Sequence, residues 1–192
     1  MGKTYVVSDL HLLHFNIIRY THRPFTTAEE MNDYIIKQWN ATVGDDDIVI
    51  NLGDLGFGFH KEENKALRER VKNLNGKEKI LIKGNHDKRK AQEYRDMGFT
   101  FEEKSIIRDT GTEFGRILFS HRPEDLRKYR GLAQWNLFGH LHNNPLENCE
   151  PELLALLTDK HFIFILENTD YKPLSLEDFM NTRELRRVII KN

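Results

Sequence analysis

Short apolar runs, each ending abruptly in a glycine or a polar residue, dominate the hydrophobic pattern of the chain. The run at residues 48–52 ends in Gly53 and Asp54 and is rich in branched aliphatic side chains. Similar runs occupy residues 5–8, 80–83, 117–120 and 136–138. Runs of this kind are typical of strands buried on both faces of a sheet. After the run at residues 48–52, Gly53 permits a sharp turn where a side chain would obstruct the backbone.

Between the runs at residues 5–8, 48–52 and 80–83, apolar residues recur at the spacing of amphipathic helices. Residues 27–41 begin with a capping-box pattern, Thr27 followed by Glu30, and predict one helix. Residues 61–74 predict a second helix, which an Asn-Gly pair would cap in the left-handed conformation. Strands that alternate with helices in this way indicate a layered α/β fold for the first half of the chain.

The second half of the chain predicts a different arrangement. Strand patterns at residues 100–108 and 116–120 flank a turn at residues 109–111, which indicates an antiparallel hairpin that opens a second sheet. The remaining elements are expected to be a helix at 152–158, a strand at 161–166, and a helix that Ser175 caps and that reaches Val188. We therefore expect an α/β fold in which helices flank two mixed β-sheets, a four-layer α/β/β/α sandwich, in a single domain over residues 1–192.

The composition of the chain mainly excludes certain classes of protein. The chain has 29 Lys and Arg against 30 Asp and Glu, a formal net charge of -1, so no global positive field attracts nucleic acid or anionic membranes. No apolar run approaches the ~20 residues that a membrane span needs. The single cysteine, Cys149, excludes an internal disulfide framework, and the first residues lead into a strand without a signal peptide pattern. We expect a cytoplasmic protein; its oligomeric state is left open.

Polar residues of metal-binding type follow five of the predicted strands. Ligands of open α/β sheets bind beyond the carboxyl ends of the strands, so these residues are expected to gather there. The set is Asp9, His11, Asp54, Asn85, His121, His140 and His142. Two carboxylates, one amide and four imidazoles exceed the needs of one tetrahedral ion but suit two divalent cations that share a bridging acid, for which Asp54 is the candidate. The acidic residues 45–47 lie at the wrong end of their strand and fit a solvated turn.

The five motifs, Asp-x-His, Gly-Asp, Gly-Asn-His-Asp, His and Gly-His-x-His, occur in this order within residues 5–142. In this respect the sequence resembles the calcineurin-like metallophosphoesterase superfamily, and in particular its small single-domain prokaryotic and phage phosphoesterases. Further similarity at residues 16–18, 23–25 and 170–177 extends the resemblance nearly to the C-terminus.

The resemblance implies a dinuclear centre. One metal ion would be held by Asp9, His11, Asp54 and His142. The other would be held by Asp54, Asn85, His121 and His140. The mixed carboxylate and imidazole ligands favour Mn²⁺ and are compatible with Fe, Zn, Ni or Mg. His86 would remain unligated and face the leaving group.

These expectations predict a phosphoesterase. Two cations roughly 3.5 to 4 Å apart would allow direct attack of a metal-bridging hydroxide on a phosphate mono- or diester, and His86 would assist the leaving group. His14 and Asn16 either contact the substrate phosphate or cap the next helical turn. Arg23 and Arg122 fit salt bridges better than phosphate clamps. The substrate is expected to be a small phosphorylated molecule, with nucleotides among the candidates.

Two other functions compete with this prediction. A binding scaffold can keep the fold without catalysis, but it has no physical need for a leaving-group acid such as His86 beside a full set of ligands. A hydrolase of another ester could use the same site, and turnover of generic phosphate esters would distinguish it. Residues 143–160 begin beside His142, so they either shape the substrate pocket or merely connect two elements.

Overall fold

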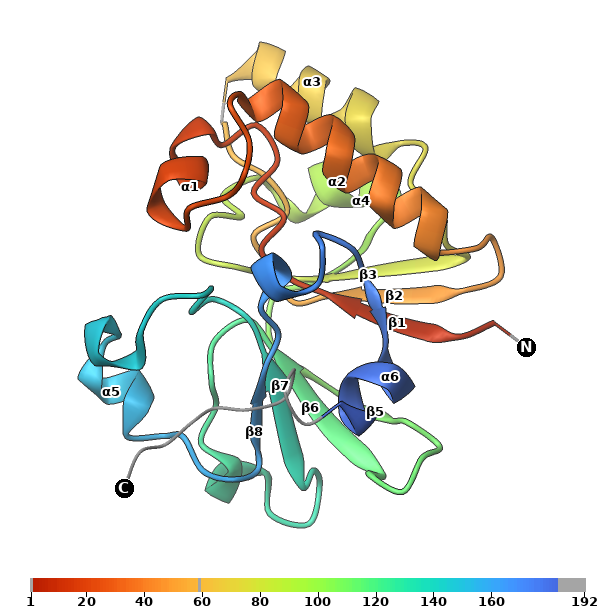
Figure 1. The fold of residues 1–192 in the computed structure, drawn as a ribbon. Helices are drawn as coiled ribbons and strands as arrows, with labels where there is room; N and C mark the ends of the chain where they lie inside the picture. The colour runs from red at the N-terminus through yellow and green to blue at the C-terminus, as the bar shows by residue number, and fades with distance from the viewer. Residues whose placement is uncertain (1, 59, 183–192) are drawn as a thin grey trace.

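The computed structural model describes residues 2–58 and 60–182, which form two packed β-sheets flanked by helices (Figure 1). The strands are β1 (Thr4–Val7), β2 (Ile48–Asn51), β3 (Glu78–Ile82), β4 (Thr100–Glu102), β5 (Ile106–Asp109), β6 (Arg116–Ser120), β7 (Trp135–Phe138), β8 (His161–Ile163) and β9 (Leu174–Ser175). The helices are α1 (Phe15–Tyr20), α2 (Ala28–Thr42), α3 (Lys61–Val71), α4 (Ala91–Asp96), α5 (Pro151–Leu154) and α6 (Leu176–Asn181).

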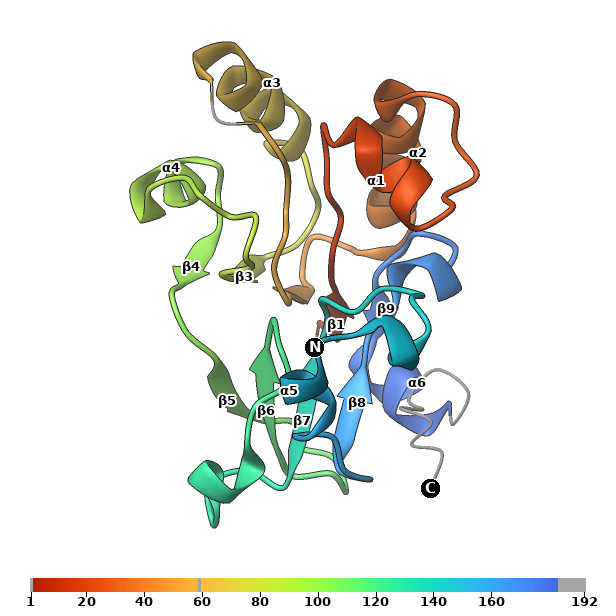
Figure 2. The ribbon, with the colours of Figure 1, turned by 90° about the vertical axis from the view of Figure 1, so that its left-hand side faces the viewer.

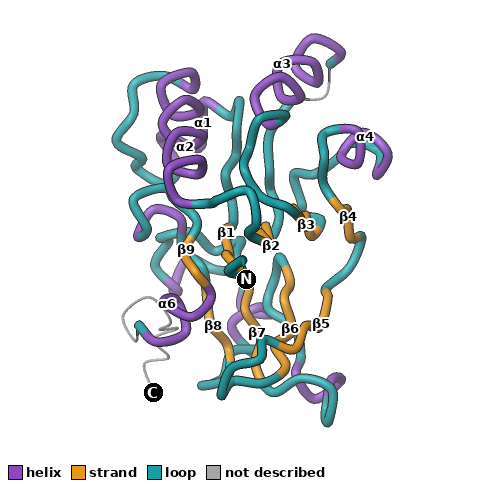
Figure 3. The backbone as a smooth tube through the Cα atoms, turned by 90° about the vertical axis from the view of Figure 1, so that its right-hand side faces the viewer, coloured by secondary structure: helices purple, strands orange, loops and turns teal. Residues whose placement is uncertain are grey.

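Both sheets are mixed, as predicted. The first has the order β4-β3-β2-β1-β9, with β9 antiparallel to the parallel strands β1 to β4. The second has the order β5-β6-β7-β8, with β5 antiparallel to β6 and the others parallel. The two sheets share one hydrophobic core that contains Val7, Phe119 and Leu137. Figure 3 shows the strands of the two sheets in the middle of the molecule, with α1 to α4 beyond the first sheet.

The helices of the first half cover the outer face of the first sheet because their apolar residues lie on one side. In α2, Met31, Ile35 and Trp39 are buried, and Thr27 caps the helix by accepting a hydrogen bond from the Glu30 N–H. The predicted second helix ends at Val71 rather than residue 74. Gly76 does have a positive φ, but it lies in the turn before β3 and does not cap α3.

The prediction of one strand over residues 100–108 was wrong, because the chain passes from the first sheet to the second within this segment and forms two strands. Residues 100–102 pair in parallel with β3, whereas residues 106–109 form the hairpin with β6. Glu103 and Lys104 between them are exposed, since here the chain crosses from one sheet to the other. A local sequence pattern specifies extended backbone, but not the sheet to which it belongs.

The outer face of the second sheet is covered by α5 and the residues around it. Side chains alternate along a strand, so Leu137 and Phe162 enter the core between the sheets while Phe138 and Ile163 point outward. Phe138 and Ile163 pack against Leu153 of α5 in a smaller hydrophobic cluster. The segment 143–160 therefore covers this face, and the helix expected at 152–158 forms only as Pro151–Leu154.

Several predicted boundaries differ at the C-terminal end of the chain. Ser175 caps the last helix as expected, and α6 is described as Leu176–Asn181, while residues 183–188 of the predicted helix lie outside the described residues. The strand expected at 161–166 is limited to His161–Ile163, and α4 and β9 had not been expected. Within the described residues, no helix is long and apolar enough to cross a membrane.

Candidate active site

The carboxyl ends of five strands bring the seven predicted ligands together. Asp9 and His11 follow β1, Asp54 follows β2, and Asn85 follows β3. The remaining three residues follow β6 and β7 of the other sheet, so the site lies where the two sheets meet. Potential ligand atoms form two groups, and the atoms of each group lie within 4.8 Å of one another. The groups are Asp9, His11 and His142, and Asp54, His121 and His140.

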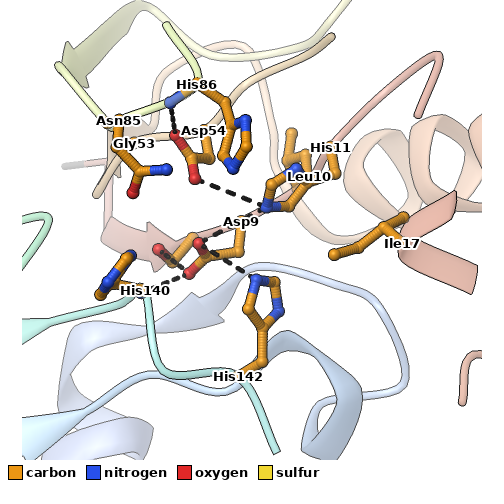
Figure 4. Close-up of polar contacts among 12 residues, drawn as sticks. Asp9, Leu10, His11, Ile17, Gly53, Asp54, Asn85, His86, His140 and His142 are labelled. Atoms are coloured by element: carbon orange, nitrogen blue, oxygen red, sulfur yellow. Dashed lines mark hydrogen bonds and ion pairs between the residues drawn. The ribbon is translucent and has the colours of Figure 1, made fainter. Parts of the chain in front are cut away.

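Asp54 belongs to the second group and also lies close to His11 of the first group, as Figure 4 shows. Its Oδ2 is 3.5 Å from His11 Nε2 in one group and 3.4 Å from His121 Nε2 in the other. Its Oδ1 accepts a hydrogen bond of 2.7 Å from the His86 backbone N–H. One oxygen therefore fixes the turn after β3, while the other is free to face both groups.

Asp9 divides its two oxygens in a similar way. Oδ2 accepts hydrogen bonds from the Ser8 hydroxyl and from the His140 backbone N–H. Oδ1 accepts no hydrogen bond from the described residues, although it is buried, and it lies 3.9 Å from His11 Nε2 and 3.7 Å from His142 Nε2. His11 Nε2 is likewise buried and makes no hydrogen bond within the part of the chain that the structure describes. Buried polar atoms without partners are costly, and a divalent cation between them would satisfy both. The residues therefore fit a metal ion.

His121 is oriented by its surroundings. Its Nδ1 lies 2.9 Å from the Leu52 carbonyl oxygen, and its Nε2 lies 2.8 Å from Asn85 Oδ1. Burial is the main reason that the pKa of His121 is lowered, so the ring is neutral at pH 7. A neutral ring whose Nδ1–H donates to Leu52 has a lone pair on Nε2, which faces the oxygens Asn85 Oδ1 and Asp54 Oδ2, and a cation among these three atoms would satisfy them. This is the tautomer that can bind a metal ion.

The ionisation of the site favours cations. Burial lowers the pKa of His11, and it lowers that of His140 to about 4, so both imidazoles keep a free lone pair. Burial, followed by the charges of Asp9 and Asp87, raises the pKa of Asp54 to about 8. Carboxylates held this close in a buried site repel each other, and positive ions between them relieve that repulsion.

The backbone at the site is unusual. Five of the predicted ligands have φ values in the left-handed region: 55° at Asp9, 51° at His11, 56° at Asp54, 72° at His140 and 52° at His142. Such a φ costs a residue with a side chain roughly 1–2 kcal/mol. Strain of this kind clusters where function requires a fixed geometry.

Glycines allow the turns of the site to approach one another. Gly53 has a φ of 113°, and a Cβ there would lie 2.6 Å from His121 Nδ1. This supports the expectation that a side chain at residue 53 would obstruct the turn. A Cβ on Gly84 would collide with Asp54 Oδ1. A Cβ on Gly139 would collide with the Ser8 hydroxyl and with Asp9 Oδ2.

Asp87 has a structural role that the sequence pattern did not reveal. It is fully buried, and its carboxylate accepts hydrogen bonds from the backbone N–H groups of Asp54, Leu55 and Gly84 and from the Tyr94 hydroxyl. It thereby joins the turn after β2 to the turn after β3. Its place at the end of the Gly-Asn-His-Asp motif was the only available signal.

Glu167 is a second residue that sequence reasoning missed. Its Oε1 lies 3.2 Å from His142 Nδ1 and accepts two hydrogen bonds from the guanidinium of Arg23. Arg23 also donates to the carbonyl oxygens of Asp9 and Leu10, so it holds the turn after β1 and forms the expected salt bridge. Burial alone would raise the pKa of Glu167, but the His142 hydrogen bond and the Arg23 charge outweigh it and lower the pKa to about 2. No motif around Glu167 marked it in advance.

Replacement of Glu167 by glutamine is expected to weaken metal binding on the His142 side by roughly 10- to 100-fold, the usual effect of losing the carboxylate that orients a histidine ligand. Isothermal titration with Mn²⁺ measures this directly. Glu152→Gln removes the same charge from an exposed position on α5 and is the control. Equal affinities in the two variants would contradict the orienting role. Thermal unfolding of the metal-free proteins checks that the fold survives when Arg23 loses its carboxylate partner.

The other predicted site residues lie at the edge of the cluster. The half-buried His86 ring has its centroid 5.2 Å from that of His11, and burial lowers its pKa. His14 contacts His11 (Nδ1 to Nδ1, 3.2 Å) and stacks on Phe57 at 4.3 Å. His14 occupies the N-cap position of α1, but its side chain makes no capping hydrogen bond.

Asn16 and Arg122 do not join the cluster. Asn16 is exposed on α1 and makes no hydrogen bond with the ligand residues of the described chain. Arg122 pairs with Glu150 at 3.3 Å, as expected for a salt-bridge residue. The structure thus brings the seven ligand candidates, His86 and His14 together, and leaves Asn16 on the rim.

The chain is similar to several known proteins in sequence or in structure. An uncharacterized protein of Methanocaldococcus jannaschii, MJ1445, is 36% identical over 193 residues, which cover 98% of this chain and 96% of that protein. The gene 66 protein of Mycobacterium phage L5 is 32% identical over 87 residues, 45% of this chain and 41% of that protein. The crystal structure of AQ665 from Aquifex aeolicus, a protein of unknown function, superposes with a TM-score of 0.70 at 25% identity, covering 94% of this chain and 98% of that one.

The family model described as calcineurin-like phosphoesterase matches residues 2–187, nearly the whole chain. This family implies metal-dependent hydrolysis of phosphate esters, and the two groups of candidate ligands agree with that chemistry. The resemblance inferred from the five motifs is thereby confirmed, and the chain belongs to the calcineurin-like phosphoesterases.

Proposed function

We propose that this protein hydrolyses a phosphate mono- or diester at a dinuclear metal centre. The observation that carries the proposal is the position of Asp54 Oδ2, which lies about equally far from a histidine of each ligand group. A carboxylate oxygen in that position suits a bridge between two cations. Small phosphorylated molecules, nucleotides among them, are the substrates proposed, in the cytoplasm.

The ligand roles follow from the two groups. Asp9, His11 and His142 would hold one ion together with Asp54, and His121, His140 and Asn85 would hold the other together with Asp54. Mn²⁺ is the favoured metal, since carboxylate, amide and imidazole ligands occur together; Fe, Zn, Ni and Mg remain candidates. When bound, two such cations activate water for direct attack on phosphorus and neutralise the charge of the phosphate oxygens.

His86 acts on the leaving group in this proposal. Its backbone is held by Asp54 Oδ1, and its half-buried ring faces the cluster without a hydrogen bond to any residue in the described ranges. The ring can therefore donate a proton or a hydrogen bond to the departing oxygen. His14, stacked on Phe57 and next to His11, is placed to contact the substrate phosphate. Asn16 is less favoured, because its side chain is exposed.

The first test is metal content and turnover. The purified protein is expected to bind two divalent ions per chain and, with Mn²⁺, to release nitrophenolate from p-nitrophenyl phosphate or from bis(p-nitrophenyl) phosphate. Elemental analysis and titration count the ions, and the two substrates separate monoesterase from diesterase activity. A single site in excess metal would contradict the dinuclear centre.

The rival proposal, a scaffold without catalysis, makes the opposite prediction. Absence of turnover on both substrates with each of the five metals would favour it. The presence of His86 beside a complete ligand set favours the enzyme, because a contact surface needs neither.

A further inference from the structure

A groove of about 450 Å³ opens beside the ligand cluster, where the chain crosses from the first sheet to the second. Figure 2 shows β4 continuing into β5 along this edge of the molecule. The walls of the groove are the end of β3, the crossing residues 103–105 and the end of β6. Asn85 and His121 also line it, so the groove leads directly from the proposed metal centre to solvent.

Positive charge dominates the lining of the groove. The cationic side chains are Lys83, Lys88, Lys104 and Arg122, against the two carboxylates of Glu103 and Glu124. Lys83 is paired with Glu103 at 2.7 Å. Lys88 and Lys104 are exposed, and their side chains make no ion pair or hydrogen bond with residues 2–58 or 60–182. Their charges are therefore available to a ligand.

This concentration of charge is local. The whole chain has a formal net charge of -1, so a general excess of lysine does not explain it. The family chemistry places a phosphate at the ligand cluster, and the lysines lie along the route by which the rest of an extended substrate would leave it. Exposed lysines bind phosphate as flexible point charges and need no fixed geometry.

We propose that the groove binds a second phosphate group of the substrate, so that the preferred esters carry at least two phosphates. The inference rests on the proposed function, because only an ester held at the centre leads a second phosphate into the groove. Two sources supply the same chemistry: a nucleoside bisphosphate and the terminal phosphate of a short nucleic-acid strand. In both, the second phosphate is linked covalently to the phosphate that reacts.

The test uses substrates matched except for one phosphate. Adenosine 5′-monophosphate is compared with adenosine 3′,5′-bisphosphate, and the dinucleotide dTpdT with its 5′-phosphorylated form pdTpdT. For each pair, the ratio of kcat/KM with and without the second phosphate is measured for the Mn²⁺-loaded protein. The groove variant is Lys88→Ala/Lys104→Ala. The control is Lys37→Ala/Lys65→Ala, which removes the same charge from exposed positions on α2 and α3.

In the groove variant, the ratio is expected to fall roughly tenfold in at least one pair, the combined effect of two exposed charge contacts. The control should keep the wild-type ratio, and one-phosphate substrates should react at the wild-type rate in both. The pair that responds identifies the source of the phosphate. A ratio unchanged in both pairs, or an equal loss on one- and two-phosphate substrates, would overturn the inference.

Binding separates this inference from the proposed function. If the wild-type protein hydrolyses neither the p-nitrophenyl esters nor any of the four nucleotide substrates, the proposed function has failed. Isothermal titration with adenosine 3′,5′-bisphosphate and pdTpdT then tests the groove alone. Weaker binding to the groove variant than to the control supports the groove, and equal binding overturns it. Thermal unfolding confirms that both double variants are folded.

Discussion

Replacement of Asp54 by alanine is expected to remove both metal ions and to abolish turnover, whereas His142→Ala is expected to weaken mainly one ion. The reason is positional. Asp54 Oδ2 lies 3.5 Å from His11 Nε2 and 3.4 Å from His121 Nε2, whereas the close contacts of His142 Nε2 are with Asp9 in its own group. The metal ions supply several kcal/mol of transition-state stabilisation, and each 1.4 kcal/mol is about a factor of ten, so turnover should fall by ~10³-fold or more.

The Asp54→Ala variant should remain folded. Within residues 2–58 and 60–182 its carboxylate accepts one hydrogen bond, from the His86 N–H, while Asp87 independently holds the backbone N–H of residue 54. Elemental analysis and circular dichroism therefore separate loss of metal from loss of structure. If the two variants lose metal equally, Asp54 is an ordinary ligand and the dinuclear assignment must be revised.

Replacement of His86 by asparagine is expected to leave both ions in place and to reduce turnover by ~10²- to 10⁴-fold on alkyl phosphate esters, the usual worth of a general acid. The His86 side chain lies at the edge of the cluster and is in neither ligand group. An alkoxide is a poor leaving group and needs the proton, whereas a nitrophenolate departs almost unaided. The deficit on p-nitrophenyl esters should therefore be much smaller.

The control for this variant is His22→Asn. His22 is exposed and has a φ of 53°, a conformation that asparagine tolerates well, so the exchange there should change neither metal content nor turnover. An equal deficit for alkyl and aryl leaving groups, with metal intact, would mean that His86 stabilises charge on the phosphate and donates no proton. Loss of metal would show that His86 is a ligand after all.

The strand ends were predictable from sequence because each one is a local event. An apolar run followed by a glycine and an acid, as at residues 48–54, specifies a buried strand and a sharp turn through the properties of adjacent residues. Since parallel strands end at the same edge, the gathering of Asp9, Asp54 and Asn85 followed from the order of the elements. Helix α2 was predictable for the same reason, because its cap and its apolar side lie within fifteen residues.

Contacts between distant parts of the chain could not be predicted in this way. Arg23 and Glu167 are 144 positions apart, and neither has a neighbour in sequence that predicts the other. Packing of the second sheet against the first brings Glu167 to His142, and burial then makes the pair obligatory, since neither charge could remain there alone. The groove beside Asn85 and His121 has the same origin, because its walls come from both sheets.

The sequence by itself determined the family, the alternation of strands and helices in the first half and the residues that converge at the strand ends, because periodicity and short motifs encode these locally. The tertiary structure decided which oxygen of Asp54 faces both ligand groups, the left-handed backbone at Asp9 and His11, and the break between β4 and β5. Each of these depends on where one sheet lies against the other. That relation arises from packing across the shared core, and no local stretch of sequence specifies it.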